Sequence, residues 1–318
     1  MRAIYINAYG GSENLIYGEL PDPVPDRKQV LIRVAVASVN PVDWKVREGR
    51  LKFLSGKRFP MVMGSELSGT IESTGEGVKD LKPGDRVYAG MGYRGGGYAE
   101  KVVASQRQVI GIPDKLSFHD AATLAIAGVT PLQAFTLHHR VRPGDEVLVN
   151  GGSGGVGTYA IQIAKVLGAR VTAVCSERNI EMVKNLGADE VIDYNRERFT
   201  EREAAFDVVL DAASNVFFPE ARGCLKKGGT LIKLNLTPGS LFRSVWTRLI
   251  GSRKLKMILL KNRPQDVRWM IDHIVAGKIQ VVTDRIFSLE KAREAQEYSQ
   301  TGRARGKVLI EVNSRAEG

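Results

Sequence analysis

The hydrophobic pattern of the chain changes near residue 120. Before that point, short runs rich in β-branched residues alternate with turns that contain Gly and Pro, and these runs span 30–36, 69–74, 86–88 and 98–103. Such runs are typical of a partly open β-barrel or sandwich. After Asp120, apolar runs of strand length alternate with segments of helical periodicity. This alternation predicts an α/β fold with a doubly wound parallel sheet.

The alternating part is expected to open with a helix near 120–138. Strands are then predicted at 147–149, 170–174, 190–194, 206–210 and 230–234, with helices at 156–167 and 179–186. The tail is predicted to form a helix over 265–275, another over 289–299 and a strand over 307–312. The pattern does not say with which part of the chain the tail packs.

A glycine-rich loop separates the first of these strands from its helix. Within residues 151–157, Gly152, Gly154 and Gly157 have the spacing GxGxxG. In this context one glycine permits a tight turn, one lets backbone approach a pyrophosphate, and one lets helix and strand pack closely. The N–H groups that begin the helix attract phosphate. We therefore predict a dinucleotide site, and the alternative is a plain glycine-rich turn. The predicted site is made by Gly152, Ser153, Gly154, Gly155, Val156 and Gly157.

Composition narrows the class of protein. The 318 residues allow two domains with separate cores, and 43% hydrophobic with 25% charged residues is ordinary for a globular chain. The two cysteines, Cys175 and Cys224, indicate neither a disulfide framework nor a structural zinc site. The N-terminus lacks a signal-peptide core, and no apolar run reaches membrane-spanning length. A reducing, cytoplasmic setting is expected.

The formal net charge of +11 predicts attraction to anions. Residues 242–263 carry seven cations and no acid, interleaved with Trp246 and several Leu and Ile residues. We favour a pocket lid with a solvated basic face. Peripheral contact with an acidic membrane and contact with nucleic acid are the two disfavoured alternatives.

Several ordered motifs extend over the whole chain. They read Val30-Leu-Ile-Arg-Val34, Ser38-Val-Asn-Pro-Val-Asp43, Gly64-Ser-Glu-Leu-Ser-Gly69, Lys82-Pro-Gly-Asp-Arg-Val87, Gly97-Tyr-Ala-Glu100, the glycine loop, Leu186-Gly-Ala-Asp-Glu-Val-Ile-Asp-Tyr194 and Gly302-Arg-Ala-Arg-Gly-Lys-Val308. Together they resemble the medium-chain dehydrogenase/reductase superfamily, and specifically its zinc-free quinone oxidoreductase branch.

The resemblance implies a GroES-like β-rich catalytic domain over residues 1–122 and a Rossmann cofactor-binding domain over 123–262. Residues 263–318 would form a C-terminal segment that completes the catalytic domain. The active site would lie in the cleft between the domains. Members of the family are commonly dimers or tetramers, so a homodimer is a possible assembly.

The chain departs from the zinc-dependent relatives at two metal-ligand positions. It has Asn40 where they have Cys and Ser65 where they have His, and neither replacement is a good zinc ligand, so no metal is expected. Hydride delivery to a simple ketone creates a localised alkoxide that zinc stabilises, whereas a quinone or α,β-unsaturated carbonyl spreads the charge. We therefore predict NADPH-dependent reduction of enones, enals or quinones.

Four residues are predicted beside the substrate. Asn40 would donate its amide N–H to the substrate oxygen, and Trp44 would line one side of a flat substrate ring. Tyr93 or Tyr98 is a further candidate. The alternatives are that Asn40 stabilises a loop and that Trp44 belongs to the core. No general acid is evident, so solvent would supply the proton.

The cofactor prediction rests on residues after the second strand. Ser176 and Arg178 could bind a 2′-phosphate, as could Tyr194 by its family-matching position. Glu177 could instead hold ribose hydroxyls or face solvent, and NADPH is favoured. By the resemblance, the nicotinamide would be bordered by Thr130, Leu234 and Asn235.

Two other functions remain open. One is an enoyl-thioester reductase, in which the basic segment 242–263 would receive the phosphates of coenzyme A or an acyl carrier. The other is a non-enzymatic NADPH-responsive protein that binds RNA or a membrane. The preferred partner is a small conjugated carbonyl or quinone.

Overall fold

The computed structural model describes residues 1–234, 244, 247 and 252–313, and it divides into two compact units. Unit 1 comprises Met1–Ala125 and Thr283–Gly318, and unit 2 comprises Ile126–Val282. The chain therefore leaves unit 1, forms unit 2 and returns. Each unit has its own sheet system.

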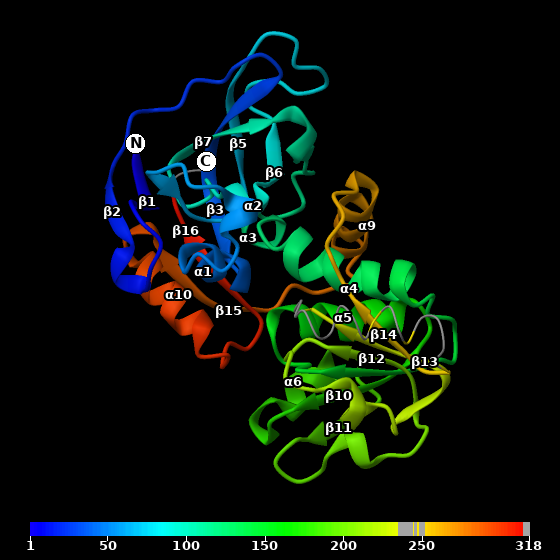
Figure 1. Ribbon diagram of the computed structural model, residues 1–318. Coiled ribbons are helices and arrows are strands. Elements are labelled where there is room, and N and C mark those ends of the chain that lie inside the picture. Colours follow the sequence, from blue (N-terminus) through cyan, green and yellow to red (C-terminus); the bar gives the residue numbers. More distant parts are fainter. Residues whose placement is uncertain (235–243, 245–246, 248–251, 314–318) are drawn as a thin grey trace. The chain divides into compact units, whose positions relative to one another are not determined.

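Unit 1 contains two sheets (Figure 1). The smaller has the order β2 (Ile16–Glu19), β1 (Arg2–Ile6), β4 (Met61–Val62). The larger has the order β15 (Thr283–Ser288), β16 (Lys307–Glu311), β3 (Gln29–Val39), β5 (Glu66–Thr74), β6 (Arg86–Gly90), β8 (Val109–Gly111), and β7 (Lys101–Ser105) also pairs with β3. Its helices are α1 (Pro41–Arg47), α2 (Lys52–Ser55), α3 (Phe118–Ala121) and α10 (Ala292–Gln300), and a 3₁₀ turn, η2, spans Gly92–Arg94.

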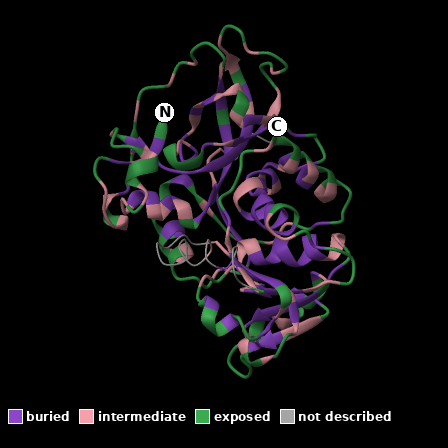
Figure 2. Cartoon of the chain, turned by 45° about the vertical axis from the view of Figure 1, so that its right-hand side comes forward, coloured by how far each residue is buried: buried purple, intermediate pink, exposed green. Residues whose placement is uncertain are grey.

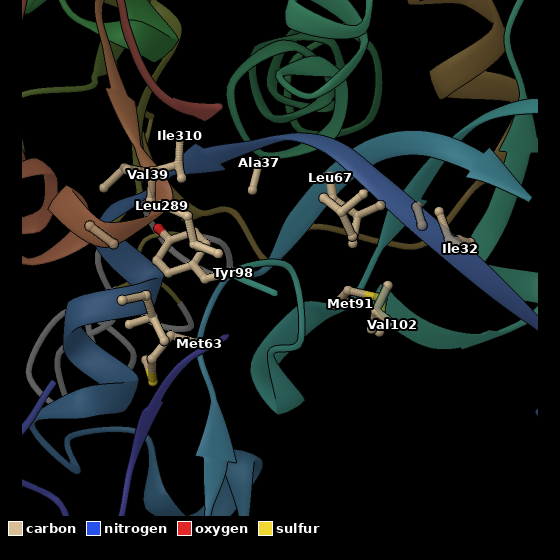
Figure 3. Packing of buried hydrophobic residues seen from close by; sticks show 14 of the residues in the cluster. Ile32, Ala37, Val39, Met63, Leu67, Met91, Tyr98, Val102, Leu289 and Ile310 are labelled. Carbon is tan, nitrogen blue, oxygen red and sulfur yellow. The ribbon is translucent and has the colours of Figure 1, made fainter. Parts of the chain in front are cut away.

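The core of unit 1 joins residues that lie far apart in the sequence. Figure 3 shows side chains from β3, β5 and β7, such as Ile32, Leu67 and Val102, in one cluster with Leu289 and Ile310 from the C-terminal part. Strand β16 pairs antiparallel with β3. The last strand thus has its partner near the beginning of the chain. The GroES-like β-rich domain is confirmed.

Unit 2 contains a six-stranded sheet in which every pairing is parallel. Its order is β11 (Glu190–Asp193), β10 (Arg170–Cys175), β9 (Glu146–Asn150), β12 (Phe206–Asp211), β13 (Leu225–Lys233), β14 (Lys254–Met257). Its helices over the described residues are α4 (Thr130–Gln133), flanked by π-helical turns within 124–138, then α5 (Gly155–Val166), α6 (Ile180–Asn185), α7 (Phe218–Ala221) and α9 (Pro264–Val275). The central strands are buried, as Figure 2 shows in purple, and the predicted Rossmann-like sheet is confirmed.

One domain boundary differs from the prediction. Residues 263–282 were expected to join the catalytic domain, but the structure places them in unit 2. The reason is polar as well as apolar packing: Gln133 donates to Asp266 at 2.7 Å, and Gln162 donates to the carbonyl of Gln280 at 2.9 Å. The return to unit 1 begins at Thr283.

The described part of the basic segment also differs from the prediction. Residues 254–257 form β14, an edge strand of the parallel sheet, rather than part of a pocket lid. Leu255 and Ile258 are buried, and Leu255 belongs to an apolar cluster of unit 2. The rest of the segment between 242 and 251 lies outside the described residues, apart from Ser244 and Thr247. Along the described ranges, no helix combines the length and apolar character needed to cross a bilayer.

Candidate functional site

The glycine loop connects the carboxyl end of β9 to the beginning of α5. Gly151 has a φ of +83°, which starts the turn, and Gly152 donates its N–H to the carbonyl of Val174 at 2.9 Å. A Cβ on Gly157 would lie 2.1 Å from the carbonyl oxygen of Gly151, so only glycine allows helix and loop to approach this closely. The tight-turn and close-packing roles therefore belong to Gly151 and Gly157.

Gly154 differs from its neighbours in the loop. It is the N-cap of α5, and a Cβ built on it would meet no atom closer than the Gly151 carbonyl oxygen at 3.5 Å. The residue has no side chain to cap the helix, and the first N–H groups of a helix lack partners within it. This open, positively polarised turn fits the pyrophosphate of a dinucleotide.

The predicted 2′-phosphate residues lie at the ends of β10 and β11. Cys175 and Asp193 are register partners, and Tyr194 donates its N–H to the Cys175 carbonyl at 3.2 Å, so Tyr194 stands beside the turn that contains Ser176 and Arg178. Both Arg178 and Tyr194 are exposed. The structure therefore brings these three residues into one neighbourhood.

Two further residues in this neighbourhood were missed by the sequence reasoning. The Asn179 amide donates to the hydroxyls of Ser153 at 3.0 Å and Ser176 at 3.2 Å, which links the glycine loop to the end of β10. The Arg196 guanidinium pairs with Glu177 at 2.8 Å. That contact engages the acid that could otherwise hold ribose hydroxyls. The sequence signal that could have identified Arg196 is its position two residues after Tyr194.

The three residues predicted to border the nicotinamide lie in three different settings. Thr130 lies in α4, is buried and donates its hydroxyl to the Ile126 carbonyl at 2.7 Å, so its hydroxyl is engaged within the helix. Leu234 follows β13 and is partly exposed. Asn235 lies outside the described residues.

A buried polar network crosses the ends of β9, β12 and β13 in unit 2. Asn150 donates to Asp211 and to Asn215, each at 2.8 Å, and the Lys233 ammonium lies 3.7 Å from Asp211. Asp211 is fully buried. Sequence patterns did not reveal this network because its members come from three strands. It fixes the edge of the sheet on which dinucleotides bind in this type of fold.

Asn40 occupies the centre of a second buried network, in unit 1. Its amide nitrogen donates to the Ser38 hydroxyl at 2.9 Å and to Glu66 at 3.1 Å, and its amide oxygen accepts from the Lys307 ammonium at 2.6 Å. The exposed fractions of Asn40, Glu66 and Lys307 are 1%, 0% and 3%. Because both amide hydrogens are engaged, the structure does not present Asn40 as a donor to substrate, and its position resembles the loop-stabilising alternative.

Lys307 and Glu66 balance each other's charge. Their closest atoms are 3.8 Å apart, and Glu66 also accepts from Ser38 at 2.6 Å and from the N–H of Ala125 at 3.2 Å. Burial lowers the pKa of the Lys307 ammonium, and the charge of Glu66 opposes that shift. Both residues stand in the motifs at 64–69 and 302–308, but nothing in those motifs indicated that they meet.

Tyr98 is fully buried, so it is not positioned to touch a substrate. Figure 3 shows it inside the apolar core, near Leu289 and Val39. Its hydroxyl donates to Asp43 at 2.9 Å, and the Asn40 backbone N–H donates to the same carboxylate oxygen at 2.8 Å. Burial raises the pKa of Asp43 to about 6, although these two hydrogen bonds favour its ionised form. Tyr98 and Asn40 together fix the first turn of α1.

Trp44 and Tyr93 are the more accessible of the four predicted substrate residues. Trp44, on α1, is partly buried, and the charged ends of Lys45 and Arg50 lie 5.4 and 5.7 Å from its ring centre. Its indole N–H has no hydrogen-bond partner within the described part of the chain. Tyr93 lies on η2 with 38% of its surface exposed. In the same described ranges, no three His, Cys, Asp or Glu side chains gather as metal ligands.

Two family models match the chain. The model described as "Alcohol dehydrogenase GroES-like domain" matches residues 26–114, and that described as "Zinc-binding dehydrogenase" matches residues 186–310. Together with the parallel sheet and glycine loop, these matches define a nucleotide-binding dehydrogenase that uses NAD(P).

Similar proteins specify the branch of the family to which the chain belongs. A chloroplastic quinone oxidoreductase of Triphysaria versicolor is 35% identical, over 98% of both chains. A trans-enoyl reductase of Aspergillus terreus is 32% identical, over 92% of this chain and 90% of its own. The chain belongs to the medium-chain dehydrogenase/reductase superfamily, in its zinc-free quinone oxidoreductase branch, and is an oxidoreductase.

Solved structures agree with this placement. The quinone oxidoreductase from Coxiella burnetii superposes with a TM-score of 0.90 at 32% identity, over 98% of this chain and 99% of that one. A mycobacterial protein solved in complex with NADPH has a TM-score of 0.82 at 25% identity, over 98% of this chain and 100% of that one.

Proposed function

We propose that the chain reduces a quinone or an α,β-unsaturated carbonyl with NADPH and without a metal ion. The observation that carries this proposal is the chemistry at positions 40 and 65. Position 40 is an amide engaged with Ser38, Glu66 and Lys307, and position 65 is a hydroxyl. Neither is a thiolate or an imidazole, the ligands that zinc prefers. An acceptor that spreads incoming charge by conjugation suits such a site.

The cofactor part of the proposal rests on unit 2. When bound, NADPH supplies a hydride to the acceptor. The open turn at Gly154 and the N–H groups that begin α5 bind the pyrophosphate, and Ser176, Arg178 and Tyr194 bind the 2′-phosphate. Arg196 supports this choice because it pairs with Glu177 and adds positive charge. Thr130, Leu234 and Asn235 remain the proposed border of the nicotinamide.

The acceptor part rests on unit 1. Trp44 and Tyr93 supply aromatic surface for a flat conjugated ring. Asn40 and Tyr98 act indirectly, because both hold Asp43 and so fix the helix that carries Trp44. Solvent protonates the enolate or quinol oxygen. Both cysteines are free thiols, which supports a reducing, cytoplasmic setting as part of this proposal.

The test of the reaction is NADPH oxidation with a panel of quinones, enals, enones and simple ketones. Turnover is expected with the conjugated acceptors and not with the ketones, and added chelator is expected to leave the rate unchanged. Zinc-dependent oxidation of a primary alcohol would contradict the proposal. NADPH binding without turnover of any acceptor, together with salt-sensitive RNA binding, would favour the non-enzymatic function instead.

The enoyl-thioester alternative is favoured by one finding, the similarity to a trans-enoyl reductase. The same assay separates it, because that alternative requires crotonyl thioester to be reduced with a higher kcat/KM than free enones. Equal or lower efficiency with the thioester would leave the quinone and enone proposal in place.

Cofactor preference is tested with Arg178→Gln. Loss of a charge-assisted hydrogen bond to phosphate is expected to lower kcat/KM for NADPH about tenfold to a hundredfold and to leave NADH almost unaffected. Arg198→Gln, which changes an exposed arginine four residues after Tyr194, is the matched control. Equal losses for both cofactors would show that Arg178 does not read the 2′-phosphate.

A further inference from the structure

An exposed tip of unit 1 combines apolar side chains with cations. It consists of α2 with its flanking residues and of η2, which lies against α2. We call it the α2 tip and define it by Arg50, Lys52, Phe53, Leu54, Lys57, Arg58 and Arg94. Phe53 is 94% exposed and Leu54 is 55% exposed. Helix α2 buries none of its residues, so the apolar pair does not serve the core.

The backbone of the tip has free space beside it at two glycines. A Cβ built on Gly56 or on Gly92 would meet no atom within 4 Å. The Lys52 ammonium lies 5.8 Å from the centre of the Phe53 ring, so cation and aromatic surface are presented side by side. A flat partner can therefore reach both kinds of side chain at once.

The charge of the tip is strongly positive. Residues 49–65 and 91–99 contain no Asp or Glu. Arg50 pairs with Glu48 at 2.7 Å, whereas Lys52, Lys57, Arg58 and Arg94 have no ion-pair partner among the residues that the structure describes. An anionic partner would complement these four cations.

We propose that the α2 tip docks on the surface of an anionic lipid bilayer, with Phe53 and Leu54 in the interfacial region and the cations on the headgroups. Exposed aromatic and aliphatic side chains flanked by Lys and Arg are what such an interface binds. A second copy of the chain fits poorly, because a symmetric contact would bring the same cations face to face. Nucleic acid would complement the charge but gives Leu54 no partner.

Docking at the tip has a consequence for the reaction. A chain held at a bilayer surface has access to acceptors that dissolve in the lipid, such as quinones with apolar tails. This consequence rests on the proposed function, whereas the docking itself does not. The two can fail separately, because vesicle binding is measured without NADPH or an acceptor.

The experiment is flotation of the full chain with phosphatidylcholine vesicles, with and without phosphatidylglycerol. Binding is expected only to the anionic vesicles and is expected to weaken as salt is raised. Lys57→Gln with Arg58→Gln should weaken it about thirtyfold, and Phe53→Ser with Leu54→Ser about tenfold or more. All four positions are exposed, so the thermal unfolding midpoint should not change.

Matched controls lie elsewhere on unit 1. Val24→Ser changes an apolar residue that is 83% exposed but stands between Asp22 and Asp26, and Arg27→Gln with Lys79→Gln removes two exposed cations outside the tip. Neither control is expected to alter binding. Equal binding to neutral vesicles, or unchanged binding by the Phe53 and Leu54 double variant, would overturn the proposal.

Two other results would also overturn it. RNA binding without vesicle binding would assign the tip to nucleic acid. A change in sedimentation from dimer to monomer in the Phe53 and Leu54 double variant, without vesicle binding by the original chain, would assign it to self-association. Turnover of a water-soluble quinone, measured in parallel, reports on the proposed function alone.

Discussion

At the scale of single residues, unit 1 buries several ionisable side chains. Glu66, Lys307, Asp43 and Arg47 are each at most 3% exposed. Buried charges persist where hydrogen bonds and opposite charges compensate for lost water. Glu66 and Lys307 compensate each other, and Arg47 donates to Gln296 at 2.7 Å. Asp43 receives hydrogen bonds from the Asn40 N–H and the Tyr98 hydroxyl but forms no ion pair within the described ranges, and burial raises its pKa to about 6.

Asp43 is therefore expected to make stability depend on pH. Its pKa in the folded chain, about 6, lies above its ordinary value of 3.8, so the native state binds more protons between these values. Stability should fall as pH rises from about 4 to about 6, by at most about 3 kcal/mol, and then level off. Urea unfolding at a series of pH values measures this, and Asp43→Asn should flatten that part of the profile.

Asp114→Asn is the control for this measurement, because the Asp114 side chain is 100% exposed. It should keep the original pH profile. If Asp43→Asn also kept it, the raised pKa of Asp43 would be refuted.

At the scale of elements, different glycines of the loop before α5 serve folding and ligand binding, although both belong to one motif. Gly157 serves folding, because its missing Cβ allows α5 to lie against Gly151. Gly154 serves the ligand side, because space beside it is open and its φ of −83° is allowed for any residue. The sequence identified the motif, but only the structure assigned each glycine its role.

Two alanine variants test this division. Gly157→Ala places a methyl group 2.1 Å from a carbonyl oxygen and should lower the free energy of unfolding by about 1–3 kcal/mol. Gly154→Ala should cost less than about 1 kcal/mol, since it changes an N-cap without a clash, yet weaken NADPH binding about tenfold or more. Denaturant unfolding and calorimetric titration measure the two effects. The reverse ranking in stability would refute the assignment.

At the scale of the whole molecule, the chain closes unit 1 with its last segment. Strand β16 stands between β15 and β3, and its residue Ile310 is fully buried beside residues from the first third of the chain. Unit 2 is inserted between the two parts. The stability of unit 1 therefore depends on residues that are synthesised after unit 2.

Ile310→Ala is expected to destabilise unit 1 by about 2–5 kcal/mol, because a fully buried isoleucine leaves a cavity. Hydrogen exchange should accelerate in β3 and β5 and remain unchanged in β9 and β10. Ile286→Ala on the neighbouring strand is the matched control, since Ile286 is 51% exposed and should have little effect. Equal acceleration in both units would show that they unfold together.

From the sequence alone came the strands β9 to β13 of the parallel sheet, the change from a β-rich part to an alternating part, and the glycine loop. These are local properties: a period of two or of 3.6 residues shows which face is apolar, and a glycine shows where backbone lies close to backbone. The family motifs added the zinc-free branch and the candidate residues at 40, 44, 93 and 98.

Which distant residues meet depends on the three-dimensional fold. It engaged Asn40 with Lys307, buried Tyr98 on Asp43, placed α9 in unit 2 and made residues 254–257 an edge strand. Each of these results depends on pairing between segments tens to hundreds of residues apart. Local periodicity carries no information about such pairing, because the same apolar face can be covered by any complementary element.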